Sequence, residues 1–264
     1  MERVRLEQLR LLRIMVETLN LINMGQSPTL TFLIKLFIVE TFTSKQGEGL
    51  WTGVESTFIR FGGCLLCCRY CDTAYAFWEG GKIKEYCVDE IMKIVRQQEP
   101  EHVVLTGGEP MFYGELVPLT RQLKANDYTV TIETSGTLDL PVQCDLMSIS
   151  PKLSNSTPYG LKNKAKIARH EANRARPEVI RSLIGRYAYQ LKFVVDTEND
   201  LPEIEEYLQQ FPEVLKSRVL LMPQGTDLEV LRKKTAWILD YCRQTGYQLC
   251  PRMHIEWYGN QRGK

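Results

Sequence analysis

Four of the chain's eight cysteines stand within eight consecutive residues, as Cys64-Leu-Leu-Cys-Cys-Arg-Tyr-Cys71. A disulfide framework spreads its cysteines through a short secreted chain, whereas clustered thiols in a reducing compartment more often hold a metal. Structural zinc prefers four ligands, usually in two separated pairs, and no second pair follows here. Cys64, Cys68 and Cys71 therefore favour a [4Fe-4S] cluster with one open iron. Zinc, with Cys67 as a fourth ligand, is the alternative.

A glycine-rich motif, Leu105-Thr-Gly-Gly-Glu-Pro110, follows the cysteines by thirty-odd residues and comes at the end of an expected strand. Two glycines allow the backbone to approach a ligand closely, and Glu109 offers an acceptor for an ammonium group. In isolation such a motif is most simply a turn. Its place after a strand and after the cysteine cluster makes it a strong signal for ligand binding.

These two motifs are similar to the signature of the radical S-adenosylmethionine superfamily. The resemblance implies that the open iron chelates the amino and carboxylate groups of S-adenosylmethionine. One electron from the cluster would then cleave the cofactor to a 5′-deoxyadenosyl radical. The Gly-Gly-Glu backbone would hold the methionine amino group.

Further segments narrow the resemblance to one family. Over residues 36–264 the chain resembles the 7-carboxy-7-deazaguanine synthases. The segments that carry the resemblance are Gln46–Gly49, Ser56–Cys64, Cys71–Thr73, Glu133–Gly136, Ser150–Lys152, Gln190–Phe193, Met222–Gln224 and His254. The family's reaction is a lyase step that turns 6-carboxytetrahydropterin into 7-carboxy-7-deazaguanine with loss of ammonia, in queuosine and deazapurine biosynthesis. The resemblance also implies a homodimer that uses Mg²⁺, a reducing electron donor of the flavodoxin kind, and an incomplete, modified TIM-like (β/α) barrel.

The resemblance assigns roles residue by residue. The cluster would be ligated by Cys64, Cys68 and Cys71. The S-adenosylmethionine site would be formed by Tyr70, Cys71, Asp72, Gly108, Ser150, Pro151, Lys152, Met222, Pro223, Gln224 and Gly225. The pterin would be held by Lys45, Gln46, Gly47, Glu48, Arg60, Thr106 and His254. Magnesium would be bound by Thr73.

The residue types suit this substrate, although each has a simpler reading. Arg60 presents a planar fork for a carboxylate, and Gln46 and Glu48 present acceptors for pterin N–H groups. Thr73 is a poor Mg²⁺ site alone, so the substrate carboxylate and water would complete it. Arg60 could instead form a surface ion pair, Glu48 could lie in a solvated turn, and Thr73 could cap a helix. A lone histidine such as His254 is more often a satisfied one.

The elements that must position these residues alternate along the chain. Apolar, β-rich runs predict strands at 36–40, 56–61, 102–106, 128–133, 145–150, 190–195 and 218–222. Helical spacing predicts helices at 89–98, 201–210 and 228–242. Strands alternating with helices indicate an α/β protein with a mainly parallel sheet, open or closed into a barrel, whose site lies at the carboxyl ends of the strands.

Composition excludes several classes. The chain has 264 residues, 44% hydrophobic and 25% charged, which excludes disorder. A net charge of +1 gives no general reason to expect nucleic acid or an acidic membrane as a partner. No apolar stretch reaches the roughly 18–20 residues of a membrane-spanning helix. We therefore expect a cytoplasmic enzyme.

Residues 1–33 differ from the rest of the chain. A helix is expected over residues 4–22, followed by the breaker Gly25-Gln-Ser-Pro28. We interpret residues 1–33 as an appended extension, with Met24 as an alternative start, and residues 34–264 as the catalytic domain.

A basic run from Lys162 to Arg186 leaves a different class of function open. It carries eight Lys and Arg against Glu171 and Glu178. A solvated face is the simpler interpretation, and a patch for an anionic ligand or RNA is the sharper one. A zinc-stabilised nucleic-acid-binding module is thus one alternative function. An activase of glycyl-radical enzymes, from the same superfamily, is the other.

Overall fold

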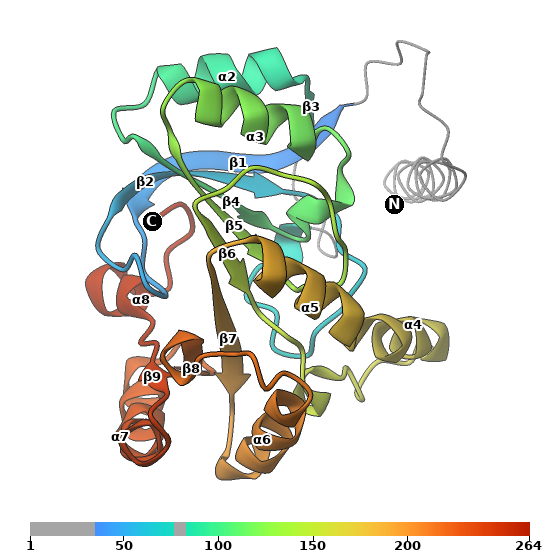
Figure 1. The fold of residues 1–264 in the computed structure, drawn as a ribbon, viewed down its shortest axis with the longest axis vertical. Helices are drawn as coiled ribbons and strands as arrows, with labels where there is room; N and C mark the ends of the chain where they lie inside the picture. The colour runs from blue at the N-terminus through green and yellow to red at the C-terminus, as the bar shows by residue number, and fades with distance from the viewer. Residues whose placement is uncertain (1–34, 77–82) are drawn as a thin grey trace.

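One nine-stranded sheet organises residues 35–76 and 83–264, the part of the chain that the computed structural model describes (Figure 1). The strands are β1 Leu36–Lys45, β2 Glu55–Phe61, β3 Lys84–Tyr86, β4 His102–Gly107, β5 Thr129–Thr134, β6 Leu146–Ile149, β7 Tyr189–Val195, β8 Val219–Pro223 and β9 Gln248–Leu249. Their order across the sheet is β3-β1-β2-β4-β5-β6-β7-β8-β9. From β2 to β9 every pairing is parallel, and β1 runs antiparallel to both β2 and β3.

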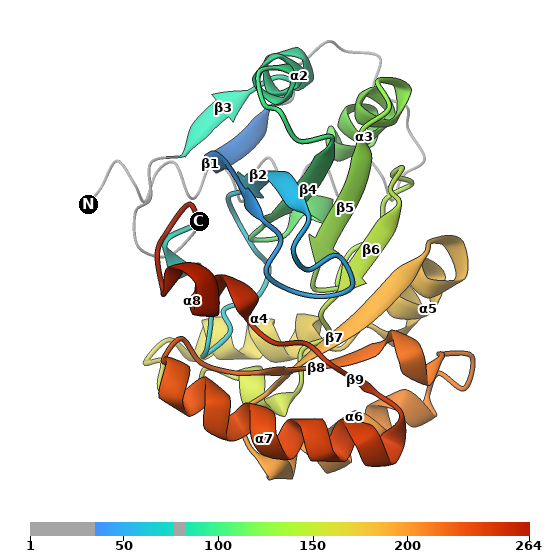
Figure 2. The same ribbon diagram turned by 90° about the vertical axis from the view of Figure 1, so that its left-hand side faces the viewer.

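The helices lie between successive strands, except for the last helix, which follows the last strand, β9. They are α2 Val88–Arg96, α3 Leu116–Ala125, α4 Lys164–Arg174, α5 Pro177–Arg186, α6 Leu201–Gln209, α7 Leu228–Thr245 and α8 Met253–Tyr258. Short 3-10 turns occur at η1 Ala74–Ala76, η2 Pro110–Phe112, η3 Ser154–Ser156, η4 Glu198–Asp200 and η5 Lys216–Arg218. Helices α3, α5 and α7 contact β5, β6 and β8 respectively and pack on the outer side of the curved sheet (Figure 2).

The predicted fold class is confirmed. In the described residues the sheet begins at β3 and ends at β9 without closing, as expected of an incomplete TIM-like barrel. All seven predicted strands and all three predicted helices are present. The predicted N-terminal helix lies outside the described residues.

The strands divide their side chains between a core and an open inner face. In β4, Val103 and Leu105 are buried in the main apolar cluster between sheet and helices. Thr106, on the opposite face, lines a cavity instead. Successive side chains of a strand point to opposite faces, so one short sequence serves both the core and the site. In the described part of the chain, no helix has the length and apolarity to span a membrane.

Candidate active site

A cavity of about 510 Å³ opens at the carboxyl ends of the parallel strands. Its wall comes from the β1–β2 connection, the cysteine segment after β2, the ends of β4 to β8, and the C-terminal residues from Arg252 onward. This is where ligands bind in sheets of this kind. Segments more than two hundred residues apart in sequence therefore share one cavity.

Most residues assigned from the sequence line this cavity. They are Lys45, Gln46, Gly47, Glu48, Arg60, Cys64, Cys68, Tyr70, Cys71, Asp72, Thr73, Thr106, Gly108, Ser150, Lys152, Met222, Pro223, Gln224 and His254. Two residues of the expected S-adenosylmethionine set, Pro151 and Gly225, do not line it. Gly225 instead turns its carbonyl oxygen to Arg252, whose Nη1 donates to it at 2.6 Å. Both are thus behind the wall and not part of its surface.

The cysteine segment separates three thiols from the fourth. Cys64, Cys68 and Cys71 line the cavity, whereas Cys67 is buried and does not. The Cys67 thiol lies 3.6 Å from the carbonyl oxygen of Lys166 in α4. Its backbone N–H donates to Nδ1 of the buried His170, also in α4, at 3.2 Å. Cys67 therefore packs against a helix and has no place in the cavity wall.

The three cavity thiols suit a positively charged iron group. Burial raises the pKa of Cys68 to about 12 and raises the pKa of Cys71. Burial, and then the charges of Glu109 and the other cysteines, raise the pKa of Cys64 well above its usual range. Thiolates at this position thus need a neighbouring cation, and iron bound to all three would supply it.

The Gly-Gly-Glu motif builds the adjoining wall through its backbone. The Gly108 N–H donates to the Phe61 carbonyl and the Glu109 N–H to the Gly63 carbonyl, both at 2.9 Å. A Cβ on Gly108 would overlap the Gly63 carbonyl oxygen, so only glycine permits this approach. The motif thereby fixes the residue next to Cys64.

The expectation that Glu109 accepts from an ammonium group is wrong for this structure. The Glu109 side chain is fully buried and does not line the cavity. Its carboxylate accepts hydrogen bonds from Met111 N, Thr134 Oγ1, and both N and Oγ of Ser135. Glu109 therefore ties the turn after β4 to the end of β5.

Replacing Gly108 with alanine is expected to displace Gly63 and Cys64, because the new methyl group occupies the position of the Gly63 carbonyl oxygen. Iron and sulfide content after anaerobic reconstitution should fall to less than half of the native value. Gly114→Ala is the matched control, since nothing lies within 4 Å of a Cβ at Gly114. Equal iron content in the two variants would contradict this role of Gly108.

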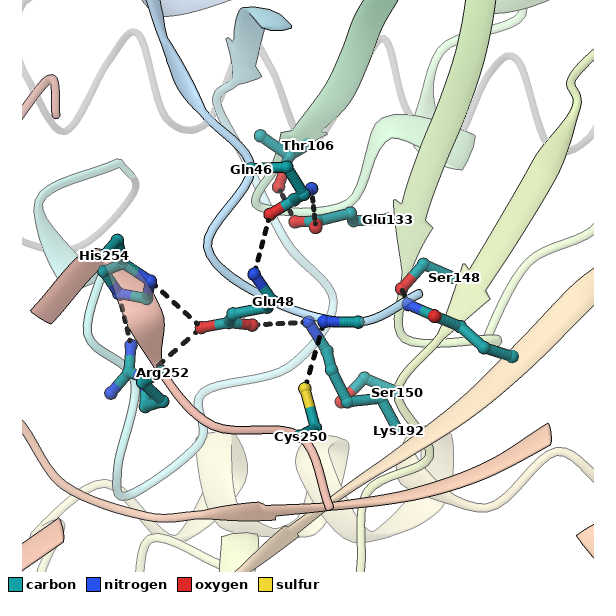
Figure 3. A network of polar contacts seen from close by, with 12 residues as sticks. Gln46, Glu48, Thr106, Glu133, Ser148, Ser150, Lys192, Cys250, Arg252 and His254 are labelled. Carbon is teal, nitrogen blue, oxygen red and sulfur yellow. Dashed lines mark hydrogen bonds and ion pairs between the residues drawn. The ribbon is translucent and has the colours of Figure 1, made fainter. Parts of the chain in front are cut away.

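A buried charge network forms another part of the cavity wall (Figure 3). The Glu48 carboxylate accepts from Lys192 Nζ at 2.5 Å and from Arg252 Nε at 3.2 Å, and lies 3.8 Å from His254 Nδ1. Although burial opposes ionisation, the charges of Lys192 and Arg252 hold the pKa of Glu48 well below its usual range. Burial lowers the pKa of His254. Glu48 is therefore ionised, with its two oxygens already oriented.

Two further polar side chains meet above this network (Figure 3). Glu133 of β5 accepts from Gln46 Nε2 at 3.2 Å and from Thr106 Oγ1 at 2.7 Å. Gln46 in turn accepts from the Glu48 backbone N–H at 3.1 Å. A heterocycle with ring N–H and amino groups would meet acceptors here from three separate elements.

Arg60 belongs to a third set of polar contacts, which also includes Arg262 of the C-terminal segment. The Arg60 Nε donates to Glu40 Oε1 at 2.7 Å, and the other Glu40 oxygen accepts from Arg262 Nε at 2.6 Å. Tyr75 donates to Glu40 at 2.8 Å, and the Arg262 guanidinium stacks 4.1 Å from the Tyr75 ring. Glu40 thus holds Arg60 by one edge, and Arg60 lines the cavity.

Several cavity residues were missed by sequence reasoning. They include Tyr75, Glu133, Ser148, Lys192, Arg252 and Arg262, and Glu40, which holds Arg60, was missed as well. For Glu133 and Lys192 a signal existed, because a charged residue inside an otherwise apolar strand faces either a partner or a site. For Arg252 and Arg262 no local pattern marked the position.

The basic run contains two helices, α4 and α5, and four of its five arginines have acidic partners. Arg174 pairs with Glu171 and Glu203, and Arg186 pairs with Asp139. Arg176 and Arg181 also lie within 4 Å of glutamates. The run is therefore largely a helix surface with ion pairs, which favours the simpler of its two interpretations.

Thr73 lies beside the cysteines. Its hydroxyl is 3.6 Å from the Cys71 thiol, and its carbonyl oxygen accepts from the N–H of Ala76, the last residue of η1. Thr73 lines the cavity. One hydroxyl is a single oxygen ligand, and Mg²⁺ favours six.

Comparison with known proteins places this geometry in a family. Residues 58–151 match the family model described as "Radical SAM superfamily". The 7-carboxy-7-deazaguanine synthase of Rhodopirellula baltica is 44% identical over 230 residues, which are 86% of this chain and 88% of the relative. The enzyme of the same name from Halobacterium salinarum is 36% identical, over 88% of this chain and 92% of the relative.

A solved structure shares the fold. The crystal structure of QueE from Escherichia coli superposes with a TM-score of 0.66 at 23% identity, over 87% of this chain and 100% of the other. The residues that line the cavity, the matching family model and the names of the relatives all indicate the same family. The chain thus belongs to the 7-carboxy-7-deazaguanine synthase family and is a radical S-adenosylmethionine lyase of deazapurine biosynthesis.

Proposed function

We propose that this chain converts 6-carboxy-5,6,7,8-tetrahydropterin to 7-carboxy-7-deazaguanine with release of ammonia. The observation that carries the proposal is the division of a single cavity. Three thiols and a Gly-Gly turn form one part of its wall, and oriented carboxylates and guanidinium groups form another. The test is mass-spectrometric detection of the product when reconstituted, reduced enzyme receives S-adenosylmethionine and the pterin.

On the cofactor side, Cys64, Cys68 and Cys71 would hold the [4Fe-4S] cluster. In the described residues no three His, Cys, Asp or Glu side chains gather closely enough for a single metal ion. Cys67, the fourth ligand that zinc would need, is buried away from the three cavity thiols, which favours the cluster over zinc. When bound, the cluster supplies the electron that cleaves S-adenosylmethionine. The residues assigned to that cofactor include Tyr70, which packs against an apolar group containing Met222.

On the substrate side, the chain's residues orient the ring and its carboxylate. Glu48, Glu133 and Gln46 offer acceptors and donors at fixed positions because each is held by a second residue. Arg60 is 15% exposed in its side chain and is held through Nε alone, so its remaining N–H groups can pair with the substrate carboxylate. The protein's contribution is orientation and exclusion of water.

Magnesium and partners complete the proposal. Thr73 would supply one Mg²⁺ ligand, with the substrate carboxylate and water supplying the others. We propose a homodimer that receives electrons from a flavodoxin-like donor in the cytoplasm, where thiols stay reduced. A metal analysis tests the zinc alternative, because the enzyme should hold about four iron and four sulfide per chain.

Arg60→Ala is expected to weaken pterin binding at least tenfold while sparing S-adenosylmethionine cleavage in the absence of pterin. The reason is that Arg60 is assigned to the pterin carboxylate, and its side chain is held by Glu40 and not by a residue assigned to the cluster. The measurement is the KM for the pterin beside the rate of uncoupled 5′-deoxyadenosine formation. The control is Arg243→Ala, an exposed arginine on α7. A parallel loss of both readouts in Arg60→Ala would make Arg60 structural.

The catalytic unit is proposed to be residues 34–264. Removing residues 1–23 is expected to leave solubility and turnover unchanged, since every described residue that lines the cavity lies at position 42 or later. The comparison is kcat and elution volume for the full and shortened chains. Loss of either property would refute the proposal.

A further inference from the structure

Arg252 stands where three segments of the site meet. Its Nε donates to Glu48 at 3.2 Å, in the segment proposed to hold the pterin. Its Nη2 donates to Asp72, next to the cluster residue Cys71. Its Nη1 donates to the carbonyl oxygen of Gly225 at 2.6 Å, in the segment 222–225 proposed for S-adenosylmethionine. Each of these contacts uses a different nitrogen of the guanidinium group.

Only arginine can make this arrangement. A guanidinium group carries five N–H donors in a rigid plane, whereas lysine offers one ammonium group on a flexible stem. The Arg252 side chain is 7% exposed, so its contacts are shielded from water. Its charge is matched by two carboxylates, Glu48 and Asp72. Removing the group leaves both without this partner and detaches the Gly225 carbonyl.

Lys192 provides the contrast. It also donates to Glu48, at 2.5 Å, but it comes from β7, which lies between β6 and β8 in the sheet. No contact recorded for Lys192 reaches Asp72 or Gly225. Lys192 therefore holds Glu48 in place whatever the state of the cofactor segments. Arg252 alone of the two connects Glu48 to them.

Residues next to Arg252 in the sequence also contact the segment around Glu48. The Gly49 N–H donates to the Cys250 thiol at 3.1 Å, and the Met253 N–H donates to the Gly47 carbonyl at 2.9 Å. Gly47 has no room for a Cβ, which would lie 2.6 Å from His254. A shift of the chain at Arg252 would thus move residues 46–49 with it.

We propose that Arg252 is a positioning residue that couples S-adenosylmethionine binding to the order of the pterin-binding segment 46–54. Cofactor contact with segment 222–225 fixes the Gly225 carbonyl, which fixes the guanidinium plane and so the Glu48 carboxylate. The inference rests on the cofactor and substrate assignments of the proposed function. Because binding linkage is reciprocal, the pterin raises cofactor affinity by the same factor.

Hydrogen exchange on the reconstituted holoenzyme tests the coupling without turnover. With the cluster oxidised, saturating S-adenosylmethionine is added and exchange is followed in peptides covering 46–54 and 219–226. The amides of Gln46, Glu48, Gly49 and Leu50 are hydrogen-bonded, so their exchange reports the order of the segment. In the native enzyme both peptides should exchange at least about fivefold more slowly with cofactor, the low end of typical coupling.

Arg252→Met is expected to keep the protection of 219–226 and to lose that of 46–54. Arg232→Met, which removes an exposed arginine of α7, should behave like the native enzyme. Protection of 46–54 retained in Arg252→Met would overturn the proposal. If the cofactor slowed exchange in peptide 219–226 of the native enzyme but not in peptide 46–54, the proposal would also be overturned. If neither peptide responds in the native enzyme, the assignment of segment 222–225 to the cofactor fails as well.

Arg252→Lys is a second variant, to be measured if Arg252→Met does not take up the cluster. It keeps the positive charge but cannot reach three partners at once. We expect it to hold the cluster and to show less than half of the native protection at 46–54. Full protection in this variant would overturn the proposal. A second readout is the pterin Kd measured with and without S-adenosylmethionine, whose ratio should fall toward one in both Arg252 variants.

Discussion

Alanine at Cys64, Cys68 or Cys71 is expected to abolish the brown chromophore and to reduce 5′-deoxyadenosine formation to background. Each thiol lines the same cavity, and a cluster with one open iron needs all three. The absorbance of the reconstituted protein and its iron and sulfide content provide the measurement. Loss of one thiolate leaves a second iron without a protein ligand, so no partial activity is expected.

Cys67→Ala is the matched control for this experiment. Cys67 is adjacent to Cys68 in sequence, yet its thiol contacts α4 and not the cavity. The variant should keep both chromophore and activity. A Cys67→Ala variant that lost the cluster, while one of the other three kept it, would show that the ligand set is wrong.

Lys192→Met is expected to have the second largest effect, because it leaves Glu48 without its 2.5 Å partner. Leaving a buried charge without any partner costs about 3–5 kcal/mol of folding free energy. Because Arg252 still pairs with Glu48, we expect a loss at or below the low end of that range. The pterin site should also fail, since Glu48 loses its orientation. Chemical denaturation measures the first effect, and the KM for the pterin measures the second.

The double variant Glu48→Gln with Lys192→Met separates these two effects. With both charges removed, no unpaired carboxylate remains beside position 192, and part of the lost stability should return. Activity should not return, because the ionised acceptor is absent. Native stability in Lys192→Met alone, or restored turnover in the double variant, would contradict this account of Glu48.

The strands were predictable because nearly all of their residues are buried, on both faces of the sheet. Runs such as His102–Thr106 and Gln190–Val195 are apolar and rich in β-branched or aromatic residues, and each is a strand in the structure. The helix α4 was not predicted, since its only buried residue is His170 and basic residues cover the rest. With two and three residues, β9 and β3 are too short to show a period.

The contents of the site were partly predictable. Motifs identified the cysteines and the segment from Gln46 to Gly49, because short-range spacing carries that information. Partners could not be read in the same way, since Lys192 and Arg252 lie 144 and 204 residues from Glu48. Glu109 shows a second limit of prediction from sequence: the residue type does not reveal whether its carboxylate faces the cavity or the interior.

The most direct measurement of the central claim is anaerobic quantification of 5′-deoxyadenosine. The protein is reconstituted with iron and sulfide, reduced, and given S-adenosylmethionine with and without 6-carboxytetrahydropterin. The account predicts cofactor cleavage, and a product of the mass of 7-carboxy-7-deazaguanine only when the pterin is present. Cleavage that ignores the pterin would contradict the proposed substrate. No cleavage, in protein that holds zinc, would contradict the proposed enzyme.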